Sequence, residues 1–182
     1  MGWAIGKHGG WSRVSAGFVL PCVLLAAASA WAQSLEYPVK ANYLVRFAAF
    51  VDWPTQAYGP ASAPMVICVV GADPFGSALT NATSGQTAHG RPVVARRMAT
   101  ISAESGCHIA YFGQGSTGPT EALERAGVLT VTDAGATRRG ALHFAVVDNR
   151  VRFHVDQAAA ARGGLSISSR LLALAVSVTG GR

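Results

Sequence analysis

The longest stretch with apolar residues at helical spacing covers residues 37–54. At about 100° per residue, apolar side chains occupy most of the helix circumference. They leave only a narrow stripe, made of Asn42, Arg46, Ala49 and Trp53. We expect a helix this apolar to lie between a sheet and a second element, either another helix or another subunit. It is expected to stop at residues 52–54, because the residue before a proline is disfavoured in the α region.

After this helix the pattern alternates between short apolar runs and helical segments. The apolar runs predict strands at residues 64–70, 91–97, 107–112 and 128–132. Asp73 and Pro74 are typical of a helix start, and a further helix is predicted at 121–126. Such alternation is typical of a parallel sheet with helices on both faces, so we predict an α/β fold, a three-layer α/β/α sandwich.

The pattern changes near the C-terminus. Residues 142–147 and 151–155 predict an antiparallel hairpin that turns at 148–150, where Asn149 suits a positive φ. Asp156 is expected to cap a short alanine-rich helix, and Ser168 or Ser169 a last helix over 170–178. The predicted sheet is therefore mainly parallel, with a C-terminal antiparallel hairpin.

The first residues have the layout of an export signal. Lys7 and Arg13 precede an apolar segment at 16–28, and two Ala-x-Ala sites follow, of which we favour cleavage after Ala32. We therefore expect residues 1–32 to be a signal peptide and residues 33–182 to form one domain in the periplasm.

Cys68 and Cys107 remain after this cleavage. In an oxidising compartment an even pair of cysteines is most simply a disulfide, and the alternative is two buried free thiols.

Charge and motifs exclude several functions. The net charge of +6 falls by two when Lys7 and Arg13 are removed, and the remaining arginines occur singly or in pairs, so we predict no nucleic-acid binding.

Residues 71–76 lie where a phosphate loop would, but the Gly-Lys-Ser/Thr signature is missing. The chain has no G-x-S-x-G, and no histidine spacing typical of a metal site, although His143 and His154 lie on the two hairpin strands. We predict no cofactor, no metal and no enzyme, unless isolated residues assemble a site.

Arginines are concentrated near the hairpin and the last helix. They are Arg150, Arg152, Arg162 and Arg170, and Arg46 is a further candidate neighbour. Together they suit an anionic ligand or an acidic partner surface. The alternative is a solvated strand edge that its charges protect from aggregation.

Several segments in order resemble the YfiR-like family of exported proteins. They are FVDWP at 50–54, ICVVGADPFG at 67–76, GRPV at 90–93, CHIAYF at 107–112, VLTVTD at 128–133 and the long segment 146–175. The resemblance implies a periplasmic α/β/α domain, often a homodimer, that represses a membrane diguanylate cyclase by binding its periplasmic domain. It also implies an outer-membrane lipoprotein that sequesters the repressor, which raises cyclic di-GMP and promotes biofilm formation.

The resemblance also carries over to single residues. Cys68 and Cys107 stand where the family's motifs place cysteines, which implies a structural disulfide, whereas a second, C-terminal pair of some members is missing. Residues that match the family's C-terminal motif are Asn149, Arg150, Phe153, Ser168, Ser169 and Leu171. Our candidates for binding a partner or ligand are Arg46, Trp53, Asn149, Arg150, Arg152 and Arg170. The alternative function is a periplasmic receptor for a small anion, with residues 71–76 and the basic hairpin forming its pocket.

Overall fold

The computed structural model describes residues 1–2, 20–118 and 120–181, and the side chains of α1 from Leu35 onward. The helices are α1 (Leu20–Phe50), α2 (Ser77–Thr83), α3 (Thr120–Arg125), α4 (Gln157–Ala161) and α5 (Ser169–Leu172), with 3-10 turns η1 (Thr55–Tyr58) and η2 (Ala103–Ser105). The strands are β1 (Val51–Asp52), β2 (Met65–Val70), β3 (Thr87–Ala88), β4 (Arg91–Met98), β5 (Ile109–Phe112), β6 (Leu129–Thr132), β7 (Leu142–Val147), β8 (Arg150–Asp156), β9 (Ser166–Ile167) and β10 (Ser177–Thr179).

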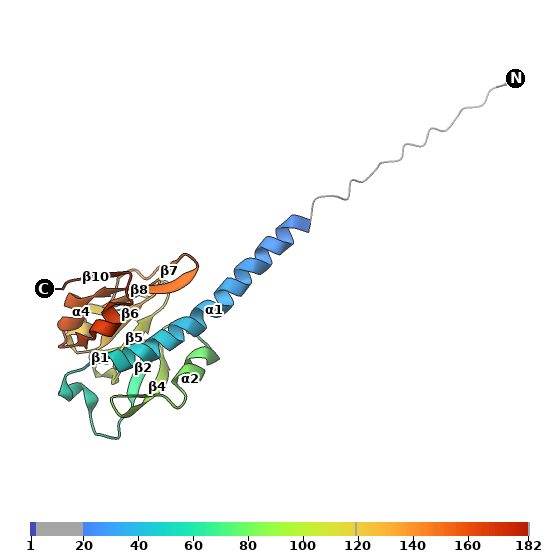
Figure 1. The fold of residues 1–182 in the computed structure, drawn as a ribbon. Coiled ribbons are helices and arrows are strands. Elements are labelled where there is room, and N and C mark those ends of the chain that lie inside the picture. Colours follow the sequence, from blue (N-terminus) through green and yellow to red (C-terminus); the bar gives the residue numbers. More distant parts are fainter. Residues whose placement is uncertain (3–19, 119, 182) are drawn as a thin grey trace.

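Eight strands form one sheet in the order β10-β8-β7-β6-β5-β2-β4-β3. The five central neighbours β7, β6, β5, β2 and β4 are parallel, and β8 returns antiparallel to β7. The fold is therefore the predicted α/β arrangement, with a mainly parallel sheet and a C-terminal antiparallel hairpin. Figure 1 shows α1 lying along this sheet and continuing beyond it at its N-terminal end.

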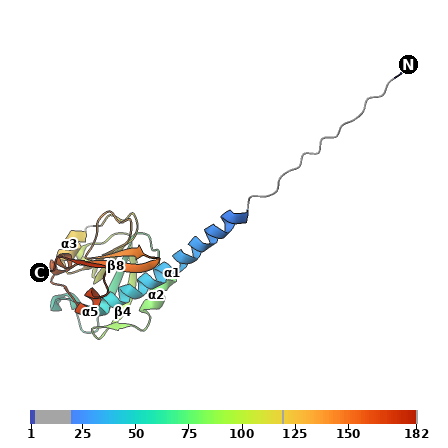
Figure 2. The same ribbon diagram turned by 45° about the horizontal axis from the view of Figure 1, so that its top comes forward.

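The two faces of the sheet have separate cores. On one face, α1 and α2 pack on alternate residues of the central strands, and Phe47 contacts Phe144 and Phe153 with ring centroids 5.7 and 5.2 Å apart. On the other face, Leu123 of α3 packs in a smaller cluster that includes Cys68 and Cys107. Figure 2 shows α3 and α1 on different sides of the sheet.

Cys68 and Cys107 form a disulfide in this smaller core, with their Cα atoms 5.9 Å apart. The bond joins β2 to the residue just before His108 and β5, and these strands are neighbours in the sheet. The structure thus contains the disulfide and not the alternative of two free thiols.

The end of α1 differs from its expected position. The helix ends at Phe50, and Val51 and Asp52 instead pair antiparallel with Ile167 and Ser166. Trp53 therefore leaves the helical phase and is buried, with only 5% exposure, against His108 and His89. The predicted stripe of Asn42, Arg46, Ala49 and Trp53 is wrong in its last member, since the other three are exposed on α1.

Two other helix predictions also need correction. The helix after β2 begins at Ser77 and not at Pro74, because the Asp73 carboxylate accepts a hydrogen bond from the Phe75 amide at 2.8 Å and fixes a turn there. The last helix stops at Leu172, and residues 177–179 form β10 parallel to β8. The alternating valines at 176 and 178 suit a strand, and β8 offers them an unpaired edge.

Most of the predicted signal peptide, residues 3–19, lies outside the described residues, as do the side chains up to residue 34. Among the helices that the structure describes, none combines the length and hydropathy needed to span a bilayer.

Candidate functional site

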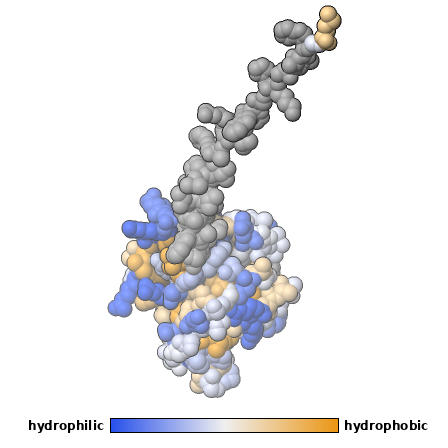
Figure 3. Space-filling view, turned by 90° about the vertical axis from the view of Figure 1, so that its right-hand side faces the viewer, coloured by the Kyte–Doolittle hydropathy of each residue, from blue (hydrophilic) through white to orange (hydrophobic). Residues whose placement is uncertain are grey.

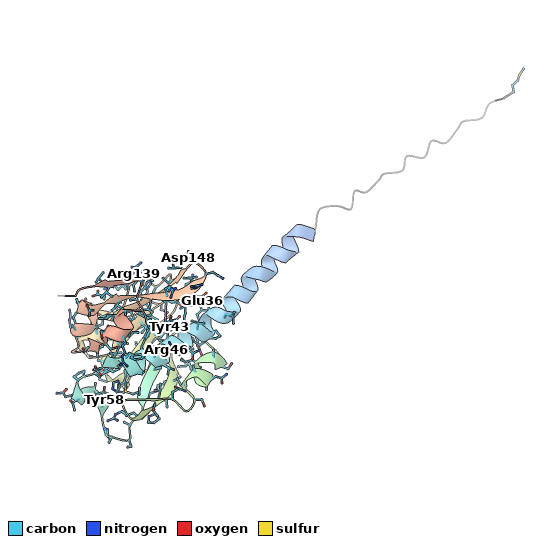
Figure 4. The ribbon with its side chains drawn as sticks, in the orientation of Figure 1. Glu36, Tyr43, Arg46, Tyr58, Arg139 and Asp148 are labelled. Carbon is cyan, nitrogen blue, oxygen red and sulfur yellow. A yellow bond between two sulfur atoms is a disulfide. The ribbon has the colours of Figure 1, made fainter. Side chains whose placement is uncertain are left out.

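A groove of about 460 Å³ separates the exposed side of α1 from the β7–β8 hairpin. We call it the α1–hairpin groove, and its lining residues are Leu35, Glu36, Val39, Tyr43, Val146, Asn149, Arg150, Val151 and Arg152. Figure 4 shows Glu36 and Tyr43 on α1 and Asp148 at the tip of the hairpin. The groove therefore joins segments that are more than a hundred residues apart in the sequence.

The hairpin reaches this position through a tight turn. Asp148 and Asn149 both have positive φ, 49° and 57°, and Val147 pairs with Arg150 on either side of them. A two-residue turn with two positive φ angles matches the right-handed twist of the strands, and Asp and Asn tolerate this conformation. The turn thus starts β8 at Arg150, so that Arg150 and Arg152 extend along the groove from its first residues.

The groove combines apolar side chains with arginines. Leu35 and Val146 are 69% and 49% exposed, and Val39 is also exposed. Arg150 and Arg152 form no ion pair with any residue that the structure describes. Figure 3 shows hydrophobic and hydrophilic side chains next to one another on the face that it turns toward the viewer. Exposed apolar side chains next to arginines are a composition typical of a protein-binding surface.

Arg46 lies on the same side of α1, in an adjoining hollow of about 290 Å³ that shares Val39 and Tyr43 with the groove. The structure thus brings together four of the six candidate residues, namely Arg46, Asn149, Arg150 and Arg152. Arg170 is exposed on α5 and does not line the groove, and Trp53 is buried elsewhere.

Beneath the groove, a buried charge cluster fastens α1 to the sheet. Lys40 is 1% exposed, and its Nζ atom donates hydrogen bonds to both carboxylate oxygens of Asp133, at 2.6 and 2.8 Å, and to Glu36. Asp133 directly follows β6, and the Tyr111 hydroxyl on β5 also donates to it. The cluster therefore lies at the carboxyl ends of two parallel strands.

Burial and the Asp133 carboxylate raise the pKa of the Tyr111 hydroxyl, in that order of size. Burial also raises the pKa of Tyr37, with Asp133 contributing next. Both phenols are therefore neutral at physiological pH, and Tyr111 acts as a hydrogen-bond donor.

This cluster was not predicted from the sequence. The available signal was a single lysine, Lys40, at helical spacing from Tyr43, Phe47 and Leu44 in an otherwise apolar segment. A lysine on an apolar helix face needs a buried acid, and Asp133 at the end of a predicted strand was a candidate.

The structure gives no support to an anion pocket at residues 71–76. Arg97 donates to Asp73 at 2.9 Å and to the Gly76 carbonyl at 2.7 Å, so these groups already satisfy one another. Within the described residues, no group of three histidine, cysteine or acidic side chains is arranged to hold a metal ion.

A family model described as YfiR/HmsC-like matches residues 37–176. The chain belongs to the YfiR/HmsC-like family. A search of curated proteins gave no match. Membership in the family supports, at that level, a periplasmic regulatory domain that acts on diguanylate cyclase signalling through a membrane protein.

The YfiR/HmsC-like match includes most of the α1–hairpin groove and the whole of the Lys40–Asp133 pair. Leu35 and Glu36 precede it, and β10 follows it. The groove and its buried support are thus features of the YfiR/HmsC-like region itself.

Proposed function

We propose that this protein is a periplasmic repressor of a membrane-bound signalling protein, a diguanylate cyclase, and that it binds the periplasmic region of that enzyme through the α1–hairpin groove. The observation that carries the proposal is the groove itself. It joins exposed apolar side chains to Arg150 and Arg152, which form no ion pair among the described residues. Its best match is a partner segment with apolar side chains flanked by carboxylates.

Binding fits the chemistry of the groove better than catalysis. The lining contains one carboxylate, Glu36, which already holds Lys40, and one phenol, Tyr43, whose ring packs against Phe47, Phe144 and Phe153, and it contains no histidine or cysteine. General acid–base or nucleophilic chemistry needs a side chain that is free to act on a bound substrate.

The proposal includes the route to the periplasm and the assembly. Residues 1–32 act as a cleavable signal peptide, as Lys7, Arg13 and the Ala-x-Ala sites indicate, and residues 33–182 form the exported domain. The domain works as a homodimer, and an outer-membrane lipoprotein removes it from the cyclase. These two parts rest on the family alone.

The test uses the double variant Arg150→Glu/Arg152→Glu and the purified periplasmic region of a membrane diguanylate cyclase from the same host. Reversing both charges places like charges against an acidic partner, so we expect the affinity to fall at least tenfold, about 1.4 kcal/mol. In cells, the variant should no longer lower cyclic di-GMP.

The matched control is Arg125→Glu, an exposed arginine on α3 whose present partner is Glu121. It changes the charge of the protein on the other side of the sheet, so binding should stay within twofold of the wild type. Thermal unfolding confirms that each variant is folded. Unchanged affinity and unchanged cyclic di-GMP in the double variant would refute the role of the groove.

A further inference from the structure

Four polar side chains form one row across neighbouring strands at the C-terminal side of the sheet. Thr132 on β6 pairs in register with His143 on β7, His143 pairs with His154 on β8, and His154 pairs with Ser177 on β10. Residues in register point to the same face of a sheet, so the four side chains are neighbours.

The two histidine rings face one another across this row. Their centroids are 6.4 Å apart and their planes differ by 30°. The Nδ1 atom of His143 lies 2.9 Å from the Thr132 hydroxyl, and the Nδ1 atom of His154 lies 2.7 Å from the Ser177 hydroxyl. Because these hydroxyls belong to the strands on either side of the pair, each ring turns its Nδ1 edge outward. The opposite edges, which carry the Nε2 atoms, are turned toward each other.

The Thr132 hydroxyl accepts from the Gly140 amide at 3.1 Å and lies 3.4 Å from the Leu142 carbonyl oxygen, in addition to its 2.9 Å contact with Nδ1 of His143. In the tautomer whose Nδ1 carries the proton and donates it to Thr132, the Nε2 atom of His143 has the lone pair. Neither Nε2 atom of the two histidines makes a hydrogen bond within the described part of the chain.

The charges around the pair are mixed. Among the charged groups, Arg139 acts most strongly on His143, followed by His154, Asp133 and Lys40. Arg152 and Asp156 lie two residues to either side of His154 on β8.

We propose that His143 and His154 form a surface site for a divalent transition-metal ion, Zn²⁺, Cu²⁺ or Ni²⁺, which their Nε2 atoms bind together. Imidazole is a preferred ligand of these three ions. The hydroxyls of Thr132 and Ser177 hold the rings through Nδ1, as outer partners do for most metal-binding histidines. Water fills the remaining coordination positions. This site is independent of the proposed function in the α1–hairpin groove.

The test measures metal binding to the untagged protein purified after export and treated with a chelator. Calorimetry with Zn²⁺ and Ni²⁺ should give one ion per chain, and the electron paramagnetic resonance spectrum with Cu²⁺ should show two equatorial nitrogens. His154→Gln should weaken binding at least tenfold and leave one nitrogen in the spectrum. Ser177→Ala keeps both ligands but frees one ring, so it should weaken binding about tenfold.

The control is His89→Gln, which removes a histidine whose Nε2 atom already contacts the Val51 carbonyl at 2.9 Å. Its metal affinity should equal that of the wild type. The half-exposed position of His154 makes its variant the safer one for folding, and circular dichroism checks each protein. Absence of binding to the wild type, or equal binding to His154→Gln, overturns the proposal.

Discussion

Two buried charge clusters hold helices to opposite faces of the sheet, and they differ in how far water reaches them. On the α1 face, Lys40 and Asp133 have side chains only 1% and 4% exposed. On the α3 face, Glu124 is 2% exposed, but its partner Arg162 at the end of α4 is 40% exposed. The Lys40–Asp133 pair is closed to solvent, although Glu36, the second partner of Lys40, is 25% exposed, whereas the cation of the Glu124–Arg162 pair is itself exposed.

The difference in solvent exposure reflects which elements each cluster connects. Glu124 accepts from Thr130 on β6 at 2.6 Å and from Arg162 at 2.6 and 3.2 Å, and it thereby links α3, the sheet and α4. The ends of α3 and α4 also touch directly, because a Cβ atom at Gly163 would lie 2.0 Å from the Glu124 carbonyl oxygen. The α3 face therefore has contacts that survive without the ion pair. On the α1 face, the cluster supports the part of α1 that lines the groove.

Lys40→Met gives the largest expected effect. It leaves Asp133 as a buried carboxylate without its cation, and breaking a buried ion pair in this way costs about 3–5 kcal/mol. Urea unfolding should show this loss in the free energy of unfolding, and binding through the α1–hairpin groove should weaken because the supporting end of α1 is released.

The double variant Lys40→Met/Asp133→Asn is the control, since it removes the unpaired charge. It should recover a large part of the lost stability, because replacing a buried pair with neutral groups is often nearly neutral. A loss below about 1 kcal/mol for Lys40→Met would mean that solvent reaches Asp133, and the contrast between the two clusters would be wrong.

Arg162→Met should have a smaller effect. Glu124 loses two charge-assisted hydrogen bonds but keeps Thr130, and water already reaches the Arg162 side of the cluster. We expect a loss of about 1.5–3 kcal/mol in the same urea experiment, the range for hydrogen bonds to charged groups. Arg125→Met, which removes an exposed pair with Glu121 on the same helix, is the matched control and should cost under about 1 kcal/mol. A loss for Arg162→Met as large as that for Lys40→Met would remove the distinction between the clusters.

The alternation of apolar runs was sufficient to predict the α/β class and the parallel central strands. The prediction failed for short segments whose apolar pattern fits a helix but which can also pair as a strand. Residues 170–178 have a helical apolar pattern, yet the free edge of β8 pairs with Ser177–Thr179. Likewise, Val51 and Asp52 continue the helical pattern of α1 but pair with β9. In both cases the deciding partner is distant in the sequence, and local periodicity carries no information about it.

For the candidate site, the sequence identified the arginines as binding candidates but not their arrangement in space. Arg150 and Arg152 were expected near both Arg170 and Arg46, and the hairpin carries them toward α1 and Arg46 but not toward Arg170. The Lys40–Asp133 pair spans 93 residues, and neither Lys40 nor the VLTVTD segment that ends in Asp133 indicates the other partner. The sequence placed His143 and His154 on the two hairpin strands but did not pair them, because their pairing depends on the register of the hairpin.

Tyr111→Phe has the smallest expected effect and tests the α1-side cluster from its sheet side. The variant removes one hydroxyl that donates to Asp133, and Lys40 and the Ala134 amide still donate to that carboxylate. We expect a loss of about 1 kcal/mol in the free energy of unfolding at pH 7.

The dependence of the free energy of unfolding on alkaline pH makes this last test specific for the Tyr111 hydroxyl. The folded-state pKa of Tyr111 is raised, mainly by burial, above the value near 10 that the unfolded chain has. Above pH 10 the unfolded state therefore releases a proton that the folded state keeps, so this contribution to stability is complete below pH 10 and is lost as the pH rises. Urea unfolding between pH 8 and 11 should show a shallower decline for Tyr111→Phe than for the wild type, by up to about 1.4 kcal/mol per pH unit. A residual decline is expected from Tyr37, whose pKa is also raised. Equal slopes for the two proteins would show that Tyr111 ionises in the folded state, which requires an α1-side cluster as open to water as the one on the α3 face.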